Sequence, residues 1–158
     1  MWMAFWIVLL TAIDQILKFI ARDYIKPVDS ITIIPNILNF TYVENRGAAF
    51  GLFQNQRWFF IAFAAIMIFV FVYLITYKHV QDKLFIVAAV LIIAGGIGNI
   101  IDRLFLGYVI DYIKVSFFPP VCNFADYCIT CGTILLMIYV LFIYKEKNVE
   151  IKEKDKIC

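Results

Sequence analysis

Residues 95–126 read GGIGNIIDRLFLGYVIDYIKVSFFPPVCNFAD, and this stretch lies between two long apolar runs. It holds one arginine together with several carboxylates and amides: Asp102, Asp111, Asp126, Asn99 and Asn123. Such groups are costly to desolvate at the ends of membrane segments, so each is expected to serve a function or to have a partner. The stretch therefore predicts a polar site where apolar segments end.

The composition indicates a membrane protein. The chain has 158 residues, of which 64% are apolar, and its mean hydropathy is +0.88. A soluble domain is nearer half apolar. The net charge of +2 excludes a broadly basic surface, and no nucleic-acid-binding pattern is present. This length accommodates about four spans and short loops, hence one domain.

Four segments are long and apolar enough to cross the membrane as helices. The first lacks the basic start and the cleavage site of a secretory signal, so we expect it to remain uncleaved. The expected fold is an all-α membrane protein, a single integral-membrane domain over residues 1–158. Its spans are expected at about residues 3–22, 58–77, 84–103 and 124–144.

Residues 23–56 differ in kind from the spans. Prolines and glycines interrupt them, and residues 31–34 and 38–43 are rich in β-forming residues. An open sheet cannot lie exposed to lipid, because its unpaired backbone groups would find no partner there. We therefore expect a small β-rich platform at the membrane surface. Gly47 and Gly51 suit either a loop that touches a ligand or a surface hairpin.

Two groups of polar residues share helix faces. Asp14 and Lys18 are four residues apart, which favours an ion pair, placed either at the helix end or inside the bundle. Asn99, Asp102 and Arg103 also fall on one face, where Arg103 can pair with a carboxylate. The small residues just before them, residues 94–98, indicate a close approach of helices. Residues 104–122 are interpreted as a loop with a short amphipathic piece.

The cysteines do not indicate a metal or redox site. Cys128 and Cys131 form a CxxC, but they lie in an apolar segment, where small packing residues are the expected role. The one histidine, His79, lies in a polar turn and is expected to be solvated. We therefore expect no metal and no cofactor.

The membrane orientation is predicted from charge. An even number of spans puts both ends on one side, and the Lys and Arg residues divide equally between the two sides. The dense basic cluster in the charged tail, residues 145–158, favours cytoplasmic termini. Asp111, Asp126 and the platform would then share the outer face.

The chain resembles the lipoprotein signal peptidases (signal peptidase II) over nearly its whole length. The resemblance rests on five blocks in the family's order. They are Asp14-Gln15 with Lys18, Asn45-Arg46-Gly47-Ala48-Ala49-Phe50-Gly51, Gly98-Asn99-Ile100-Ile101-Asp102-Arg103, Val109-Ile110-Asp111-Tyr112 and Asn123-Phe124-Ala125-Asp126. Each block alone is weak, but five in order are specific.

The resemblance implies a bacterial plasma-membrane aspartyl endopeptidase that removes signal peptides from prolipoproteins, just before a diacylglyceryl-modified cysteine. By block position the catalytic pair is Asp111 and Asp126. Tyr127 is a departure, because the family usually has serine there. The implied partners are the prolipoprotein and membrane lipid, and we expect a monomer. The supporting or substrate-binding residues are expected to be Asn45, Gly47, Asn99, Arg103, Asn123, Asp14, Lys18 and Asp102.

Two carboxylates can hydrolyse a peptide when one is ionised and activates water while the other is protonated. Which aspartate takes which role stays open at this point. Two other classes also fit acids among apolar spans. A small ion- or proton-coupled transporter would move its substrate without a cleaved product, and a non-enzymatic binder of lipidated chains would tolerate Asp→Asn at both positions.

Overall fold

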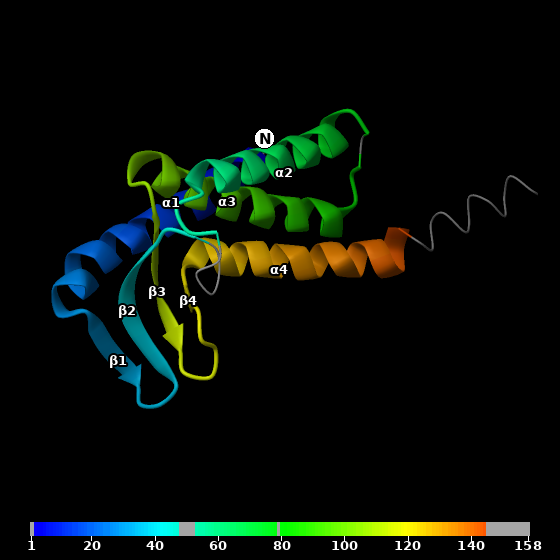
Figure 1. The fold of residues 1–158 in the computed structure, drawn as a ribbon. Coiled ribbons are helices and arrows are strands. Elements are labelled where there is room, and N and C mark those ends of the chain that lie inside the picture. Colours follow the sequence, from blue (N-terminus) through cyan, green and yellow to red (C-terminus); the bar gives the residue numbers. More distant parts are fainter. Residues whose placement is uncertain (1, 48–52, 79, 145–158) are drawn as a thin grey trace, which may run out of the picture.

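The protein, described here from a computed structural model, consists of four long apolar helices and one small antiparallel sheet (Figure 1). The structure describes residues 2–47, 53–78 and 80–144. Within them, four helices are long and apolar enough to cross a membrane. These are α1 (Trp2–Ile20) with its extensions η1 (Ala21–Ile25) and η2 (Lys26–Val28), α2 (Arg57–Thr76), α3 (Lys83–Phe105), and α4 (Phe124–Ile138) with its extension η4 (Tyr139–Tyr144). The expectation of four apolar helices is confirmed.

The first helical segment is longer than expected. The sequence placed its end at residue 22, but a wide π-helical turn and a 3₁₀ turn carry it on to Val28. Ala21 and Ile25, one turn apart, are buried against Ile110 and Tyr112. The helix therefore continues because its apolar face packs against the sheet. Residues 23–28 belong to the helix and not to the platform.

The sheet has the order β1-β2-β3-β4, and every pair in it is antiparallel. Its strands are β1 (Ser30–Ile34), β2 (Leu38–Asn45), β3 (Val109–Val115) and β4 (Val121–Cys122). The interpretation of residues 104–122 as a loop is therefore wrong for β3 and β4. The first four residues of β3 are all buried, so the strand shows none of the alternation that marks a half-exposed strand.

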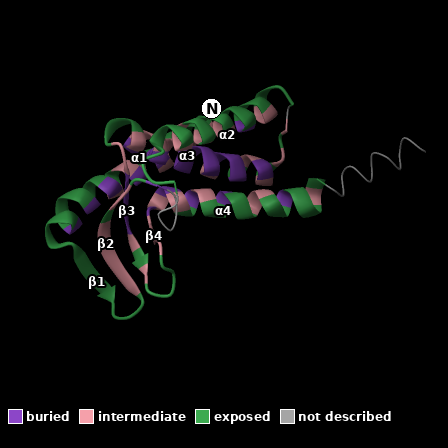
Figure 2. Cartoon of the chain, in the orientation of Figure 1, coloured by how far each residue is buried: buried purple, intermediate pink, exposed green. Residues whose placement is uncertain are grey.

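Helix α3 is the centre of the bundle, and most of its residues are buried (Figure 2). Small residues let its neighbours approach closely, as the sequence predicted. A Cβ on Gly98 would lie 2.5 Å from Asp14 Oδ2 in α1, and one on Gly132 of α4 would lie 2.8 Å from the Ala88 oxygen in α3. Close contact with α3 therefore fixes the positions of both α1 and α4.

The sheet lies at one end of the helices (Figure 1). Gly107 joins α3 to β3 with a φ of +85°, a backbone angle that suits glycine. The N–H groups of Leu106 and Gly107 both donate to the Asp102 carbonyl, at 2.7 and 3.2 Å, and so cap α3. This turn brings the end of α3, the strand β3 and the start of α4 together.

Candidate functional site

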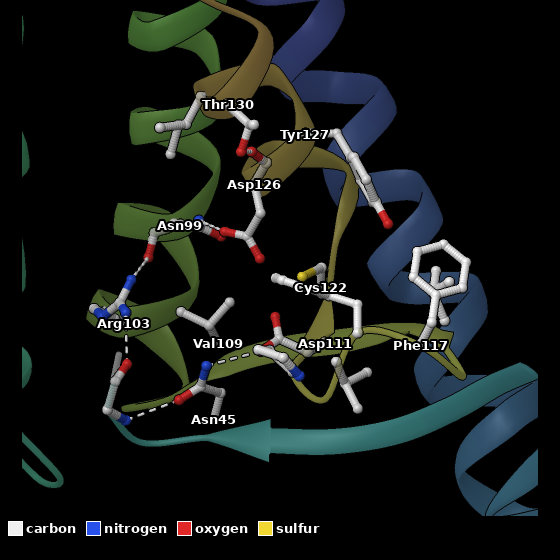
Figure 3. A pocket seen from close by; sticks show the side chains of 16 residues that line it. Asn45, Asn99, Arg103, Val109, Asp111, Phe117, Cys122, Asp126, Tyr127 and Thr130 are labelled. Atoms are coloured by element: carbon white, nitrogen blue, oxygen red, sulfur yellow. Dashed lines mark hydrogen bonds between the residues drawn. The ribbon is translucent and has the colours of Figure 1, made fainter. Parts of the chain in front are cut away.

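A cavity of about 600 Å³ opens where α3, α4 and the sheet meet (Figure 3). One wall is polar and includes Asn45, Gly47, Asn99 and Arg103. The other wall is apolar and comes from the β3–β4 hairpin and α4, with lining residues Val115, Phe117, Phe118, Pro120, Val121, Cys122, Tyr127 and Ile129. Asp111 and Asp126 both line this cavity, although they lie on different elements.

Asp111 is held in the middle of the sheet, on β3, with only 1% of its surface exposed. Asn45 on the paired strand β2 donates to Asp111 Oδ2 at 2.8 Å, and Asn123 donates to Oδ1 at 2.6 Å. Burial raises the pKa of Asp111 to about 7, and the nearby charge of Asp126 adds to this shift. A carboxyl in this setting is mostly protonated below neutral pH.

Asp126 is held in the first turn of α4 by a reciprocal cap with Asn123. The Asp126 N–H donates to Asn123 Oδ1 at 2.9 Å, and the Asn123 N–H donates to Asp126 Oδ2 at 3.2 Å. Asn99 of α3 donates to Asp126 Oδ1 at 2.9 Å. A helix N-terminus favours a negative charge, because the N–H groups of its first turn carry partial positive charge.

A buried ion cluster lies directly behind the cavity. The Lys18 ammonium lies 2.8 Å from Asp14 and 3.0 Å from Asp102, and each of these side chains is at most 3% exposed. The Asp14–Lys18 pair expected from the sequence spacing is therefore present. Asp14 also accepts the Ala125 N–H, and Asp102 accepts the Ile110 N–H, both at 3.0 Å. The cluster thus links α1, α3, β3 and α4.

Lys18 connects this cluster to the cavity through Asn99. It donates to Asn99 Oδ1 at 2.9 Å, and the same oxygen also accepts from Asn123 at 3.2 Å. The predicted residues Asp14, Lys18, Asn99, Asp102, Asp111, Asn123 and Asp126 therefore form one continuous hydrogen-bond network. Gln15 was not predicted as part of it, yet it donates to Asp14, to Asp102 and to the Gly98 carbonyl. The only signal for Gln15 in the sequence was its position beside Asp14 in the first of the five blocks.

Within the part of the chain that the structure describes, Arg103 makes no ion pair of the kind that the sequence suggested. Among the described residues it donates to two carbonyl groups, those of Asn99 at 3.3 Å and Gly47 at 3.2 Å. Its guanidinium also lies over the ring of Phe60. Arg103 therefore ties α3 to the backbone that follows β2. The same residue, Gly47, also donates its N–H to Asn45 Oδ1. Residues 48–51 of that sequence block lie outside the described residues.

Several cavity residues were not predicted from the sequence. Phe117, on the β3–β4 turn, and Cys122, on β4, come from the segment interpreted as a loop. Burial raises the pKa of the Cys122 thiol to about 11, and the charges of Asp126 and Asp111 contribute. Tyr127 is 41% exposed and lines the cavity beside these residues (Figure 3). In this chain a phenol therefore occupies the position that the family's serine would have.

The CxxC cysteines lie on α4, outside the cavity. Cys128 is buried, Cys131 is exposed, and both are free thiols. Within the described part of the chain, no group of three or more His, Cys, Asp or Glu residues is arranged to hold a metal ion. That the CxxC binds no metal stays a prediction. His79 and the tail, residues 145–158, lie outside the described residues.

Comparison with known proteins identifies the relatives of this chain. The model of the signal peptidase (SPase) II family matches residues 6–142. A lipoprotein signal peptidase of Clostridioides difficile is 45% identical over 139 residues, which are 86% of this chain and 92% of that protein. One from Caldanaerobacter subterraneus is 42% identical over 130 residues, 82% of this chain and 89% of that protein.

Solved structures resemble the fold as well. Two structures of bacterial membrane enzymes, at 1.9 and 2.3 Å resolution, superpose with TM-scores of 0.80 and 0.79. Both are 33% identical to this chain. The match to the 1.9 Å structure covers 89% of this chain and 93% of that chain. The match to the 2.3 Å structure covers 88% of this chain and 87% of that chain. The protein is therefore a multi-pass membrane protein.

The buried ion cluster predicts a large loss of stability when Asp14 is replaced by asparagine. Asp14→Asn should lower the free energy of unfolding by about 2 kcal/mol, because it removes a buried charge-assisted contact with Lys18, although Lys18 keeps Asp102 as a partner. Asp23→Asn is the matched control: Asp23 pairs with Arg22 at 3.4 Å with both side chains 43% exposed, and its loss should cost less than about 1 kcal/mol. Thermal unfolding in detergent measures both variants. Equal losses would show that burial does not matter here.

Proposed function

The chain belongs to the signal peptidase II family, and we propose that it is an intramembrane aspartyl endopeptidase of bacterial prolipoproteins. It cleaves the signal peptide just before the diacylglyceryl-modified cysteine. The observation that carries the proposal is the cavity in which Asp111 and Asp126, from two different elements, face one space between a polar and an apolar wall. In this proposal these two residues are the catalytic pair.

The arrangement suits hydrolysis of a peptide bond. Two close carboxylates do not easily ionise together, so the pair holds one shared proton. The ionised partner takes a proton from water as the water oxygen bonds to the carbonyl carbon. The protonated partner gives its proton to the carbonyl oxygen. Protons then pass to the leaving nitrogen and back to the pair, so that the products are an acid and an amine.

The substrate is proposed to bind as an extended chain. The strand order leaves β4 at the edge of the sheet, and both of its residues line the cavity. A peptide can add to such an edge by backbone hydrogen bonds. Asn45, Gly47 and Arg103 would contact the substrate on the polar wall. The apolar hairpin wall would contact its apolar residues and the lipid that it carries.

The setting proposed for the enzyme is the bacterial plasma membrane. Both termini are cytoplasmic and the cavity opens toward the outer face, as the charge distribution of the sequence favours. The enzyme is proposed to work as a monomer in contact with membrane lipid, with no metal and no other cofactor. Asp14, Lys18 and Asp102 support the site from behind, without contact to substrate.

An ion- or proton-coupled transporter remains the alternative of a different class. It would use buried acids among its spans, and its assay would show uptake without a cleaved product. The two are separated by incubating the purified protein in lipid with a diacylglyceryl prolipoprotein and weighing the products by mass spectrometry. A released signal peptide with its end just before the lipidated cysteine supports the peptidase.

Replacing either aspartate of the pair should abolish cleavage. Asp111→Asn and Asp126→Asn each remove one proton-transfer group, a role worth about 10²–10⁴ in rate, and the loss should exceed this range because neither residue can substitute for the other. The amide has nearly the shape of the carboxyl, so both variants should insert and fold. Initial rates on the purified prolipoprotein, compared at equal folded concentration, test this. Near-normal turnover in either folded variant would falsify the assignment of Asp111 and Asp126 as the catalytic pair.

The pH profile of cleavage should be bell-shaped. Burial raises the pKa of Asp111 to about 7, so the pair loses its shared proton, and activity, as the pH rises above about 7. On the acid side, activity falls when both carboxyls become protonated. The measurement is kcat/KM from pH 4 to 9 in the same detergent. A rate that continues to rise to pH 9 is incompatible with a required proton on the pair.

The orientation is tested by labelling single cysteines in a variant that lacks the native ones. Gln54→Cys and Lys114→Cys, both at exposed positions near the sheet, should react with an impermeant thiol reagent added to intact cells. Gln81→Cys, exposed in the turn between α2 and α3, is the matched control and should react only after the membrane is opened. The reverse pattern would place the cavity on the cytoplasmic side.

A further inference from the structure

The three asparagines around the acid pair have fixed orientations, because an outside donor holds each amide oxygen. Asn45 Oδ1 accepts the Gly47 N–H, and Asn123 Oδ1 accepts the Asp126 N–H, each at 2.9 Å. Asn99 Oδ1 accepts from the Lys18 ammonium at 2.9 Å. In each case the NH₂ end must then face a carboxylate. Among these outside donors, only Lys18 is a charged side chain.

We propose that Lys18 is a positioning residue: through the amide of Asn99 it directs an N–H at Asp126, and so makes Asp126 the ionised base and Asp111 the proton-carrying acid. Lys18 itself is 1% exposed and lies behind Asn99. If the Asn99 amide turned over, its oxygen would face Asp126 Oδ1, which only a protonated Asp126 could satisfy. This inference rests on the proposed function.

The surroundings of the two aspartates differ in the direction that this assignment requires. Asp126 is only partly buried, lies at the N-terminus of α4, and accepts both a backbone N–H and an amide polarised by Lys18. Charge-assisted and helix-terminal donors favour the ionised form. Asp111 is 1% exposed and accepts from two neutral side-chain amides. The burial that raises its pKa to about 7 agrees with this role.

Other titratable groups also face the pair, and they do not reverse this difference. Arg103 on α3 lines the same cavity as Asn99, and both Asp126 and Asp111 lie near enough to interact with its charge. Cys122 on β4 and Tyr127 on α4 are neutral at the working pH, because burial raises the pKa of the Cys122 thiol to about 11 and a phenol ordinarily titrates near pH 10. Tyr112 on β3 is also a neutral phenol. Asp14 and Asp102 lie behind Asn99 and share the Lys18 ammonium, which contacts both at 2.8 and 3.0 Å.

The assignment gives each residue its proton. Asp126 removes a proton from water while the water oxygen bonds to the carbonyl carbon, and Asp111 protonates the carbonyl oxygen. When the C–N bond breaks, its electron pair stays on nitrogen, which takes the proton from Asp126. A hydroxyl of the intermediate returns a proton to Asp111. The pair thus ends as it began, with one carboxylate and one carboxylic acid.

The test compares pH profiles of kcat/KM with and without the Lys18 ammonium. Lys18→Met in an Asp102→Asn background removes one cation and one carboxylate together, and Asp102→Asn alone is its control. The double variant should move the acid limb of the profile upward by about one unit, which is about tenfold in kcat/KM on that limb. The alkaline limb should move upward by less than the acid limb, because the Lys18 charge also lowers the pKa of Asp111, although less than the other groups around it do, whereas Asp126 receives the amide that Lys18 directs. Equal movement of both limbs would show that Lys18 acts by its charge alone, and unmoved limbs that it is merely structural; either result would overturn the inference.

A matched pair of asparagine variants tests the assignment even if the lysine variant does not fold. Asn99→Leu removes the N–H directed at Asp126 and should move the acid limb upward. Asn45→Leu removes one directed at Asp111 and should move the alkaline limb upward, because the acid then keeps its proton to higher pH. The inference would be overturned if Asn99→Leu moved the alkaline limb and Asn45→Leu the acid limb. It would also be overturned if neither variant moved either limb. A wild type that cleaves nothing would overturn the proposed function itself, and the inference with it.

Discussion

The constraint on which the structure depends is the cost of burying charge near the membrane. Asp14, Lys18 and Asp102 have almost no exposed surface, so each charge must find its partner inside the protein. Those partners come from α1 and α3, and the remaining carboxylate oxygens are satisfied by N–H groups of Ala125 and Ile110. A cluster of this kind is stable only when helices, strand and α4 terminus are all in place, so it selects one arrangement of the elements.

This constraint also explains why the sheet is necessary. The carboxylate of Asp111 lies on a strand, where pairing with β2 brings Asn45 within 2.8 Å of it. Asp126 lies in the first turn of α4, where the reciprocal hydrogen bonds with Asn123 hold its carboxyl in place. A helix and a strand thus present their acids toward the same cavity from different directions, and moving either carboxyl away would break the hydrogen bonds that hold it.

The sequence predicted the parts that depend on local spacing and missed those that depend on tertiary packing. The four apolar helices, the Asp14–Lys18 pair and the glycine contacts of α3 follow from composition, from residues four apart and from small side chains, and all are present. The strand β3 was missed because both of its faces are buried over its first four residues, which removes the alternation that marks a strand there. Arg103 was expected to bind a carboxylate, but its position over Phe60 directs it to carbonyl groups.

The orientation of the asparagines lay furthest beyond sequence reasoning, and it has the largest consequence for chemistry. A carboxamide can present either an oxygen or an NH₂ group to its neighbour, and spacing along the chain does not decide between them. The choice is made by donors from elsewhere, such as the Lys18 ammonium at Asn99 and the Gly47 N–H at Asn45. In the mechanism proposed here, Lys18 lies outside the cavity lining and still decides which of two neighbouring acids holds a proton, because it fixes the direction of the Asn99 amide.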